Sequence, residues 1–411
     1  GPQFFMEIAK FRALRLLWTR VVAALHGDPS VAKLARVRAV TGHTDKSRLD
    51  PHVNLLRVTA QALSAVLGGC DALHIAAFDE AAGTTTDFSR RVARNVHTLL
   101  AEEFGMAATI DPAGGSWYVE KVTDELARKA WALFQDIERR GGFAAALREG
   151  QPQELVERAA VEKRDAVAKR RSGLVGTNVF PNLKEATLEP AAGIDVAARA
   201  DELRSRRGSM PVARATPDWA SLFTAALSLA REGATVGQLS RWARTRKTAE
   251  PPIAAVKPLR LAADFEALRA ATAPGADGGG RPKVFLAKIG PVAQHKARAD
   301  FAAGFFATGG FETVSRQSHE TAEAAAVAAL TSGAPIAVLC STDETYPALV
   351  PAFARTLKTA SPSTVVIVAG LPADPAVVAA YRDAGVDEFI HRRANLVKVL
   401  GGLLKRIGAT K

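Results

Sequence analysis

The last third of the chain alternates between short apolar runs and longer helical segments, and this alternation limits the possible folds more than any other feature. The apolar runs are expected to form strands at Lys283–Ile289, Glu312–Ser315, Ile336–Cys340, Thr364–Ala369 and Glu388–Ile390. Apolar residues recur at helical spacing over about Gln294–Thr308, Thr321–Ser332, Thr345–Thr359, Pro375–Ala384 and Leu396–Ile407. Strands that alternate with helices of this length predict a parallel sheet built from βαβ units.

Five strands and five helices in about 130 residues fit a flavodoxin-like, doubly wound α/β domain. Ligands of such sheets bind beyond the carboxyl ends of the strands. The loops Gly290–Lys296, Cys340–Thr345 and Gly370–Asp374 are therefore the candidate binding site of this domain.

The first part of the chain also mixes strands with helices, but its strands are few. Strands are expected at Ala35–Thr41, Ala72–Phe78 and Ala107–Ile110. Helices are expected at about Phe4–His26, His52–Leu67, Asp87–Phe104, Tyr118–Arg139 and Glu154–Arg171. These strands are too few to close a (β/α)₈ barrel, and the open edge of a parallel sheet favours aggregation.

Irregular segments and a helical pair separate these two parts. The segment Gly173–Ala198 is expected to be irregular, and the paired helices are expected at about Trp219–Arg231 and Val236–Arg246. Linkers follow at Thr248–Pro258 and Ala271–Pro282. The glycine run Gly278–Gly280 lacks a preceding strand and a following Gly-Lys-Ser/Thr, so we interpret it as linker rather than as a phosphate-binding loop.

The composition excludes several classes of protein. Apolar residues make up 48% of the 411 residues and charged residues 23%, which excludes a disordered or collagen-like chain. The two cysteines lie far apart in sequence, which excludes a disulfide framework and favours a reducing compartment. No apolar run reaches the roughly 18 residues of a membrane helix, and the N-terminus lacks the apolar region of a signal peptide. We therefore expect a cytoplasmic protein without membrane contact.

The net charge of +12 raises the question of a nucleic-acid partner. The basic residues are spread along the chain, and no zinc-finger, KH or RNA-recognition motif accompanies them. The densest basic run, Lys163–Arg171, lies in an expected helix, where we interpret it as a solvated face. No nucleic-acid partner is expected. The chain opens Gly1-Pro2, and its first methionine is Met6, which indicates a processed or tagged start, or the C-terminal part of a longer protein.

Several motifs follow one another in a recognisable order. They are Phe4-Phe5-Met6-Glu7-Ile8-Ala9-Lys10, Thr86-Asp87-Phe88-Ser89, Val92-Ala93-Arg94-Asn95, Asp111-Pro112-Ala113-Gly114-Gly115-Ser116-Trp117-Tyr118-Val119-Glu120, Gly176-Thr177-Asn178 and Ala234-Thr235-Val236-Gly237. Together they resemble the methylmalonyl-CoA mutase family over much of the chain. The residue types in these motifs indicate mainly structural roles. For example, Asp87 and Ser116 stand where they can cap the helices that follow them.

The resemblance implies a domain organisation. Large chains of this family carry a TIM barrel that binds acyl-CoA, then a linker, then a flavodoxin-like cobalamin domain. By comparison, residues 1–172 are the last three strands of the barrel with flanking helices. Residues 173–281 are a linker with a helical pair, and residues 282–411 are a degenerate cobalamin-binding-type domain.

The resemblance also indicates what has been lost from the cobalamin domain. Active members carry D-x-H-x-x-G after its first strand, where the histidine ligates cobalt and the aspartate orients it. Here the corresponding residues are Val292, Gln294 and Ala297, so loss of cofactor binding is predicted. The neighbouring His295 is interpreted as an exposed loop histidine. In the second loop, the carboxylates and the ring of Thr342-Asp343-Glu344-Thr345-Tyr346 argue against entry of the cofactor tail.

The barrel part retains few of the family's substrate contacts. Of R-x-H-x-Q at the sixth strand only Arg38 remains, and it is a weak candidate for contact with the CoA part of a substrate. Of Q-S-L-H-T-N at the seventh strand His74 remains, while Asp71 replaces the glutamine. A single histidine in an apolar strand is more often a core residue than a ligand. The family's catalytic positions fall before Gly1, so no catalytic or metal-binding residue is assigned.

A chain that keeps the structural motifs but lacks the cofactor-binding and catalytic residues is typical of the family's small, non-catalytic subunit. The resemblance therefore implies a subunit, or a fragment of one, that binds no cofactor itself. Its partner would be a catalytic large subunit that carries adenosylcobalamin and interconverts methylmalonyl-CoA and succinyl-CoA in a heterodimer. Two alternatives remain open: half of a split, active mutase, or a regulatory module that binds a nucleotide or CoA.

Overall fold

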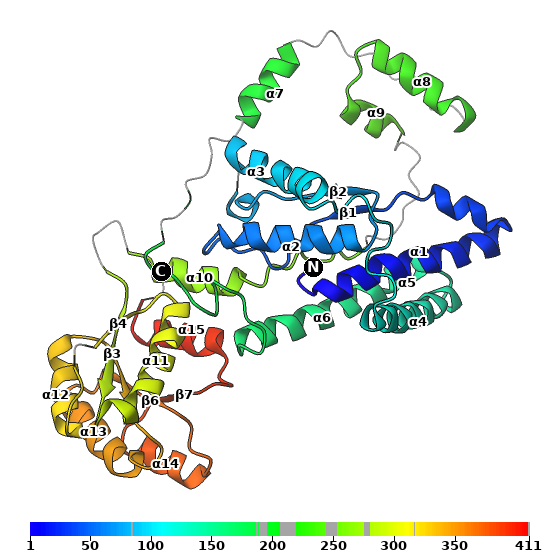
Figure 1. Ribbon diagram of the computed structural model, residues 1–411. Helices are drawn as coiled ribbons and strands as arrows, with labels where there is room; N and C mark the ends of the chain where they lie inside the picture. Colours follow the sequence, from blue (N-terminus) through cyan, green and yellow to red (C-terminus); the bar gives the residue numbers. More distant parts are fainter. Residues whose placement is uncertain are drawn as a thin grey trace.

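The two most apolar runs of the chain form the centre of a parallel sheet, as the computed structural model shows (Figure 1). They are the adjacent strands β5 (Ile336–Cys340) and β6 (Val365–Ala369), and every residue of both is buried. β3 (Lys283–Lys288), β4 (Glu312–Val314) and β7 (Glu388–Ile390) complete the sheet in the order β4-β3-β5-β6-β7, with all neighbours parallel. The order reverses between β3 and β5, which creates a crevice where ligands of doubly wound sheets bind.

Helices cover both faces of this sheet, and alternate strand residues enter one of two hydrophobic clusters. On one face lie α10 (Ala263–Ala271), α11 (Val292–Thr308) and α15 (Leu396–Arg406). On the other lie α12 (Ala322–Ser332), α13 (Tyr346–Ala360) and α14 (Pro375–Asp383). Two covered faces explain why the strands are continuously apolar.

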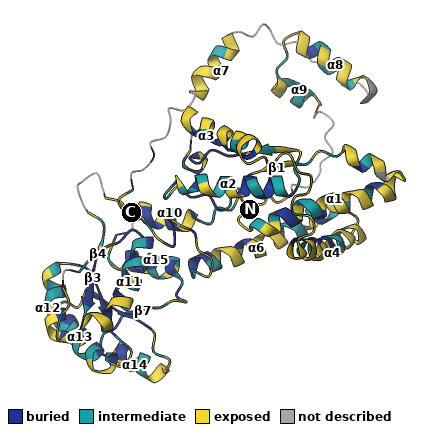
Figure 2. Ribbon diagram, viewed as in Figure 1, coloured by how far each residue is buried: buried dark blue, intermediate teal, exposed yellow. Residues whose placement is uncertain are grey.

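The first part of the chain has a two-stranded parallel sheet and many helices. β1 (Arg38–Val40) pairs with β2 (Ala72–His74) in the register Arg38 to Ala72 and Val40 to His74. The longer helices of this part are α1 (Phe4–His26), α2 (Val53–Leu67), α3 (Asp87–Thr98), α4 (Trp117–Arg139), α5 (Phe143–Glu149) and α6 (Gln151–Ala168). Shorter turns of helix are η1 (Pro29–Leu34), η2 (Glu80–Ala82) and η3 (Leu99–Glu103). Buried residues concentrate around the five-stranded sheet, whereas α1 and α4 are largely exposed (Figure 2).

The structure describes residues 1–83, 85–185, 188, 195–205, 219–243, 253–274, 280–315 and 317–409. Between the two parts it contains α7 (Val196–Ser205), α8 (Trp219–Arg231) and α9 (Val236–Ala243). The expected helical pair is thus present as α8 and α9. Much of both expected linkers, including Gly278, lies outside the described residues. None of the described helices is both long and apolar enough to cross a membrane.

Several predictions of elements were wrong. Ala107–Ile110 was expected to be a strand but consists of turns and bends, because a strand needs a paired neighbour and this segment has none. The helix expected over Asp87–Phe104 is α-helical only to Thr98 and continues as the π-helical turn η3. α10 was missed altogether. Its nine residues lie between two stretches read as linker.

Two expected helix caps were also wrong. Thr86, not Asp87, caps α3: its hydroxyl accepts from the amide of Ser89, while Asp87 in the first turn pairs with Arg90. Ser116 precedes α4, but its side chain makes no capping hydrogen bond.

Two arginines join the first part of the chain to the five-stranded part. The guanidinium of Arg269 on α10 is buried and donates to the carbonyls of Gly176, Thr177 and Thr308. Arg170 stacks over the rings of Phe301 and Phe305, with distances of 5.2 and 5.3 Å to their centroids. The prediction of a solvated face over Lys163–Arg171 is therefore wrong at Arg170, which lies against the second part of the molecule.

Candidate functional site

The crevice of the five-stranded sheet lies beyond the carboxyl ends of its strands, and the loops around it come from three elements. The loop after β3 holds Gly290 and Pro291, the loop after β5 runs from Ser341 to Thr345, and the loop after β6 starts at Gly370. The second and third loops are those that the sequence indicated, whereas the first ends at Pro291 because Val292–Lys296 belong to α11. Side chains of the chain itself occupy the space between them.

Gln294 packs over the first loop. Gly290 has a φ of +83°, and a Cβ at that position would lie 2.3 Å from Oε1 of Gln294. Gln294 is half-buried on the first turn of α11. Gln294, the residue predicted to replace the family's histidine, is therefore folded back against the backbone of the chain.

Arg298, one helical turn further along α11, reaches across the crevice to the other two loops. It donates to the carbonyl of Ala369 at 2.7 Å and to the carboxylate of Asp343 at 2.8 Å. Its guanidinium lies 5.9 Å from the centroid of the Tyr346 ring. Sequence reasoning gave Arg298 no role, although its spacing of four residues from Gln294 places both on one face of the helix.

The Tyr346 ring lies beneath the guanidinium of Arg298, on the side facing the interior of the domain. The ring is buried, and its hydroxyl donates to the carbonyl of Ala369 at 2.8 Å and accepts from the amide of Ser341 at 3.2 Å. Burial raises the pKa of Tyr346, so its hydroxyl stays protonated. The hydroxyl of Thr345 donates to Ser341 Oγ at 2.8 Å, which ties the second loop to itself.

The other predicted positions of this region differ widely in burial. Val292 is the first residue of α11 and is 62% exposed, and Ala297 is exposed on the same helix. The prediction of an exposed loop His295 is wrong. His295 lies within α11 and is only 5% exposed, because it is on the same face of the helix as buried Ala299 and Ala302. Both of its ring nitrogens lack a hydrogen-bond partner among the described residues.

The second candidate region is the face of β1 and β2 that carries Arg38 and His74. The parallel register places both residues on one face of the pair, and both are exposed. His74 is therefore not the core residue that was expected. Asp71, which was predicted to replace the family's glutamine, accepts from Arg15 at 2.8 Å and from the amide of Val37 at 2.7 Å, so it connects α1 to the start of β1.

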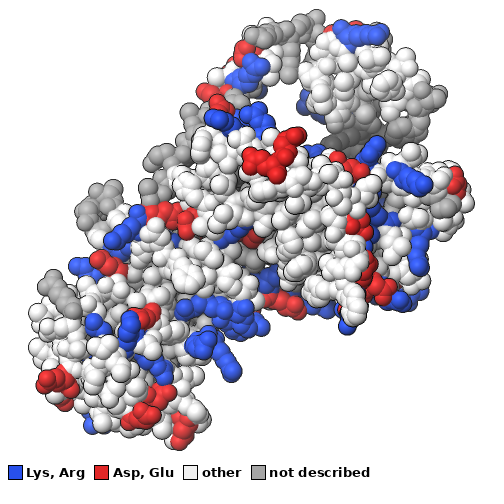
Figure 3. All heavy atoms as spheres, in the orientation of Figure 1, with Lys and Arg blue, Asp and Glu red and all other residues white. Residues whose placement is uncertain are grey.

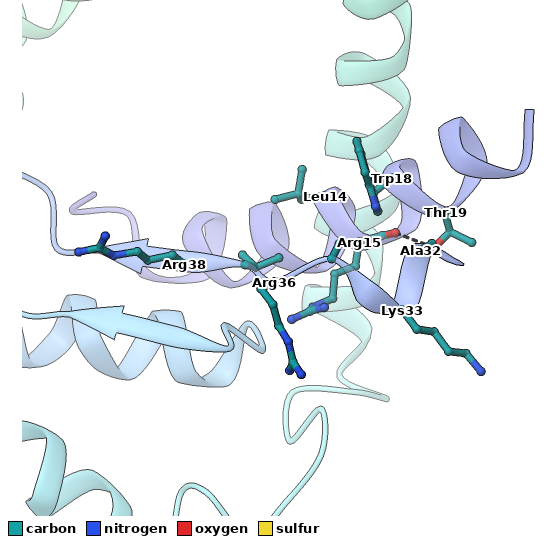
Figure 4. A pocket seen from close by; sticks show the side chains of 10 residues that line it. Leu14, Arg15, Trp18, Thr19, Ala32, Lys33, Arg36 and Arg38 are labelled. Atoms are coloured by element: carbon teal, nitrogen blue, oxygen red, sulfur yellow. Dashed lines mark hydrogen bonds between the residues drawn. The ribbon is translucent and has the colours of Figure 1, made fainter. Parts of the chain in front are cut away.

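A cavity of about 580 Å³ lies between α1 and the segment that leads into β1 (Figure 4). Leu14 and Trp18 line it from α1, and Arg15, Lys33, Arg36 and Arg38 bring positive charge to its walls. In Figure 4 the charged ends of Arg15, Lys33 and Arg36 point away from Trp18. The charges do not converge on one point, so the cavity by itself specifies no ligand.

Sequence reasoning also missed a buried polar cluster after β1. Lys46 is 1% exposed, and its ammonium lies 3.4 Å from Asp45 and 3.1 Å from Oε1 of Gln61. The amide of Gln61 in turn donates to both oxygens of Asp45, at 2.9 and 2.7 Å. Burial lowers the pKa of Lys46. Polar residues at Asp45 and Lys46, just after a strand, were the only signal for this cluster in the sequence.

In the part of the chain that the structure describes, no group of three or more His, Cys, Asp or Glu side chains could hold a metal ion. On the face shown in Figure 3, basic and acidic side chains are interspersed. The candidate regions are thus the crevice and the exposed face of β1 and β2.

Comparison with known proteins connects both regions to one family. The family model described as Methylmalonyl-CoA mutase matches residues 1–249. A protein named methylmalonyl-CoA mutase small subunit from Streptomyces virginiae is 38% identical over 98% of this chain and 55% of its own length. The small subunit from Porphyromonas gingivalis is 32% identical over 99% of this chain and 57% of its own.

A relative named simply methylmalonyl-CoA mutase, from Rhizobium meliloti, is 34% identical over 90% of this chain and 55% of its own length. Identity alone therefore does not separate small subunits from other members. The chain spans little more than half the length of the relatives it matches. The motifs, the family match over residues 1–249 and these relatives agree: the chain belongs to the methylmalonyl-CoA mutase family.

Proposed function

We propose that this chain is a non-catalytic subunit, or part of one, of an adenosylcobalamin-dependent methylmalonyl-CoA mutase. It binds no cobalamin, contributes no catalytic residue, and supports a catalytic large chain that interconverts methylmalonyl-CoA and succinyl-CoA. The observation that carries the proposal is the crevice of the five-stranded sheet, which is filled by Gln294, Arg298 and Tyr346.

The residues at the crevice do not fit cobalamin. An imidazole held by a carboxylate is the usual arrangement for a histidine that ligates a metal. Val292 and Gln294 offer neither group at those positions, and within the described part of the chain no carboxylate is bonded to either ring nitrogen of buried His295. A cofactor tail would also have to displace Arg298 from Asp343 and from the carbonyl of Ala369.

The domain organisation belongs to the same proposal. Residues 282–411 form a flavodoxin-like domain of the cobalamin-binding type, which the strand order β4-β3-β5-β6-β7 supports. Residues 1–172 form part of a TIM barrel, which the parallel pair β1–β2 with its outer helices supports. Residues 173–281 form the connection that contains α8 and α9. The protein works in the cytoplasm, without nucleic acid or membrane.

Three relatives support the partner assignment by name. Those from Streptomyces virginiae, Porphyromonas gingivalis and Mycobacterium bovis carry the words small subunit, the last as a probable one. A small subunit implies a large one, so the proposed partner is a catalytic large chain in a heterodimer. At the level of that complex the substrate is an acyl-CoA, and Arg38 and His74 are weak candidates for contact with it.

Co-expression with a tagged catalytic large chain tests this function. The untagged chain should co-purify with it in equal amounts, and the complex should hold a single cobalamin. Failure to co-purify would contradict the partner assignment. Two cobalamins per heterodimer would contradict the non-catalytic role. A large chain purified alone is the control for its own cobalamin content.

One observation favours a second candidate, half of a split, active mutase. Within the described residues β1 and β2 pair only with each other, so one edge of each strand is free, and Arg38 and His74 lie together on the open face. A polypeptide supplying further strands could pair with these edges. In that case mutase activity should appear only when the two polypeptides are mixed, and Arg38→Met and His74→Leu should weaken substrate binding.

A further inference from the structure

The contacts of Arg298 extend the proposed function to a specific residue. Its side chain starts on α11, on one side of the crevice, and ends on the loops that follow β5 and β6. The two hydrogen bonds, 2.7 Å to Ala369 and 2.8 Å to Asp343, therefore connect three separate elements through one guanidinium. A planar guanidinium with several fixed donors is suited to such a bridge, whereas an ammonium is not.

We propose that Arg298 is the residue that holds this crevice shut and so decides that it takes no ligand. The proposal rests on the proposed function but names the residue responsible for it. In doubly wound domains a ligand lies between these loops. Here the loops are held together by a side chain of the chain itself.

The glycine opposite Arg298 supports this role. Gly370 has a φ of +155°, and a Cβ there would lie 2.4 Å from a terminal nitrogen of Arg298 and 3.3 Å from the Tyr346 ring. Only a residue without a side chain leaves space for the guanidinium at this point. Arg298 and Gly370 are thus complementary in shape.

Opening the crevice has a cost that follows from the same contacts. Tyr346 also donates to the carbonyl of Ala369, so that oxygen accepts from two side chains. A ligand that displaced Arg298 would leave the half-buried guanidinium without its two acceptors. Unless the ligand carried an acceptor in the same position, binding would lose two charge-assisted hydrogen bonds.

Hydrogen exchange on the full chain, without any added ligand, tests the proposal. The variant is Arg298→Met, which keeps an unbranched apolar stem and removes the guanidinium with its donors. The amides to follow are Ser341, Thr345 and Gly370, each of which is hydrogen-bonded in the closed form. We expect their exchange to become about tenfold faster, since the bridge consists of hydrogen bonds to a charged group.

Lys296→Met is the matched control. Lys296 is two residues away on the same helix and exposed, and it pairs with Asp300 rather than with a loop of the crevice. Its removal should leave exchange at Ser341, Thr345 and Gly370 unchanged. Equal exchange in Arg298→Met and wild type would overturn the proposal, as would an equal increase in Lys296→Met.

Asp343→Asn is the second variant, and it tests whether the Arg298 bridge holds the crevice closed if Arg298→Met does not fold. Asp343 is largely exposed, so its replacement should not disturb folding. We expect faster exchange in the loop after β5, and an unchanged rate there would contradict the bridge. Because the readout uses no cofactor, failure of this inference is distinct from failure of the proposed function, which cobalamin content decides.

Discussion

At the scale of single residues, the molecule contains several polar side chains whose burial requires a partner. Asp45, Lys46, Asp79 and Arg269 are each less than a tenth exposed. Their positions could not be predicted from sequence, because burial of a polar group depends on which elements pack over it. The predicted loss of the cobalamin motif at Val292, Gln294 and Ala297 could be read from the sequence, because a motif and its spacing are local, and it stays a prediction. The burial of His295 could not be predicted in this way, because it depends on which face of α11 packs against the sheet.

The buried pair Asp45 and Lys46 leads to a prediction about stability. Lys46→Met should lower the free energy of unfolding by about 3 kcal/mol, because it leaves the buried carboxylate of Asp45 without its cation. The double variant Asp45→Asn with Lys46→Met should recover much of this loss. Urea denaturation of both variants is the measurement, with exposed Lys33→Met as control. If the double variant is no more stable than the single one, the pair is not coupled.

His295 leads to a prediction about pH. Burial, and then the charge of Lys288, lowers its pKa below the usual 6.5. The unfolded chain therefore binds a proton that the folded chain does not, and stability is lost as the pH falls through 6.5. Between about pH 7.5 and about pH 5.5, wild type should lose roughly 1 kcal/mol more than His295→Leu. Denaturation at both pH values measures this, with exposed His26→Gln as control. Parallel losses in His295→Leu and wild type would show that this histidine does not titrate on unfolding.

At the scale of elements, the strands of the second part were predictable and those of the first part less so. Ile336–Cys340 and Glu388–Ile390 match their predicted bounds, since a fully buried strand is a continuous apolar run between turn residues. Ala107–Ile110 has the same composition as a short strand but no neighbour to pair with. Pairing is a property of the sheet, so it could not be predicted from the segment alone.

The turn at Asp111–Ser116 shows how elements are fixed to each other. Arg12 on α1 donates to both oxygens of Asp111, at 2.9 and 3.0 Å, and to Glu120 on α4 at 2.8 Å. Glu120 also accepts from the amide of Gly115 at 3.0 Å. Asp111 itself has a φ of +47°, so the turn is held in a conformation that this residue seldom adopts.

Arg12→Lys should therefore be destabilising, although it keeps the charge. An ammonium cannot bond both carboxylates in the plane of a guanidinium, but both carboxylates are about half exposed, so we expect a loss of at most about 1 kcal/mol in the free energy of unfolding. Thermal and urea denaturation check this, and Arg20→Lys, exposed on the same helix, is the control. A variant as stable as wild type would mean that α4, rather than Arg12, holds the turn.

At the scale of the whole molecule, the two parts are joined by buried contacts and not only by the chain between them. Arg269 donates to Gly176 and Thr177 at 2.9 and 3.0 Å, and the amide of Leu261 donates to the carbonyl of Thr44 at 2.8 Å. Burial lowers the pKa of Arg269 to about 10. The sequence indicated two parts and a connection, but not this junction, because α10 was not predicted.

Arg269→Met should separate the unfolding of the two parts. The variant leaves the carbonyls of Gly176, Thr177 and Thr308 buried without their donor, at a cost of roughly 1–3 kcal/mol for each that water does not reach. In scanning calorimetry we expect a single transition in wild type and two in the variant, with exposed Lys405→Met like wild type. A single, unshifted transition in Arg269→Met would show that the junction depends on other contacts.

Titration of the chain with adenosylcobalamin tests most directly the proposal that this member of the mutase family binds no cobalamin itself. Absorbance and calorimetry should be recorded together, with a catalytic large chain as positive control. We expect no heat of binding and no change in the cobalamin spectrum at concentrations that saturate the catalytic chain. Saturable binding with the spectrum of histidine-bound cobalt would contradict the account, make His295 the suspected ligand, and make the split enzyme the leading interpretation.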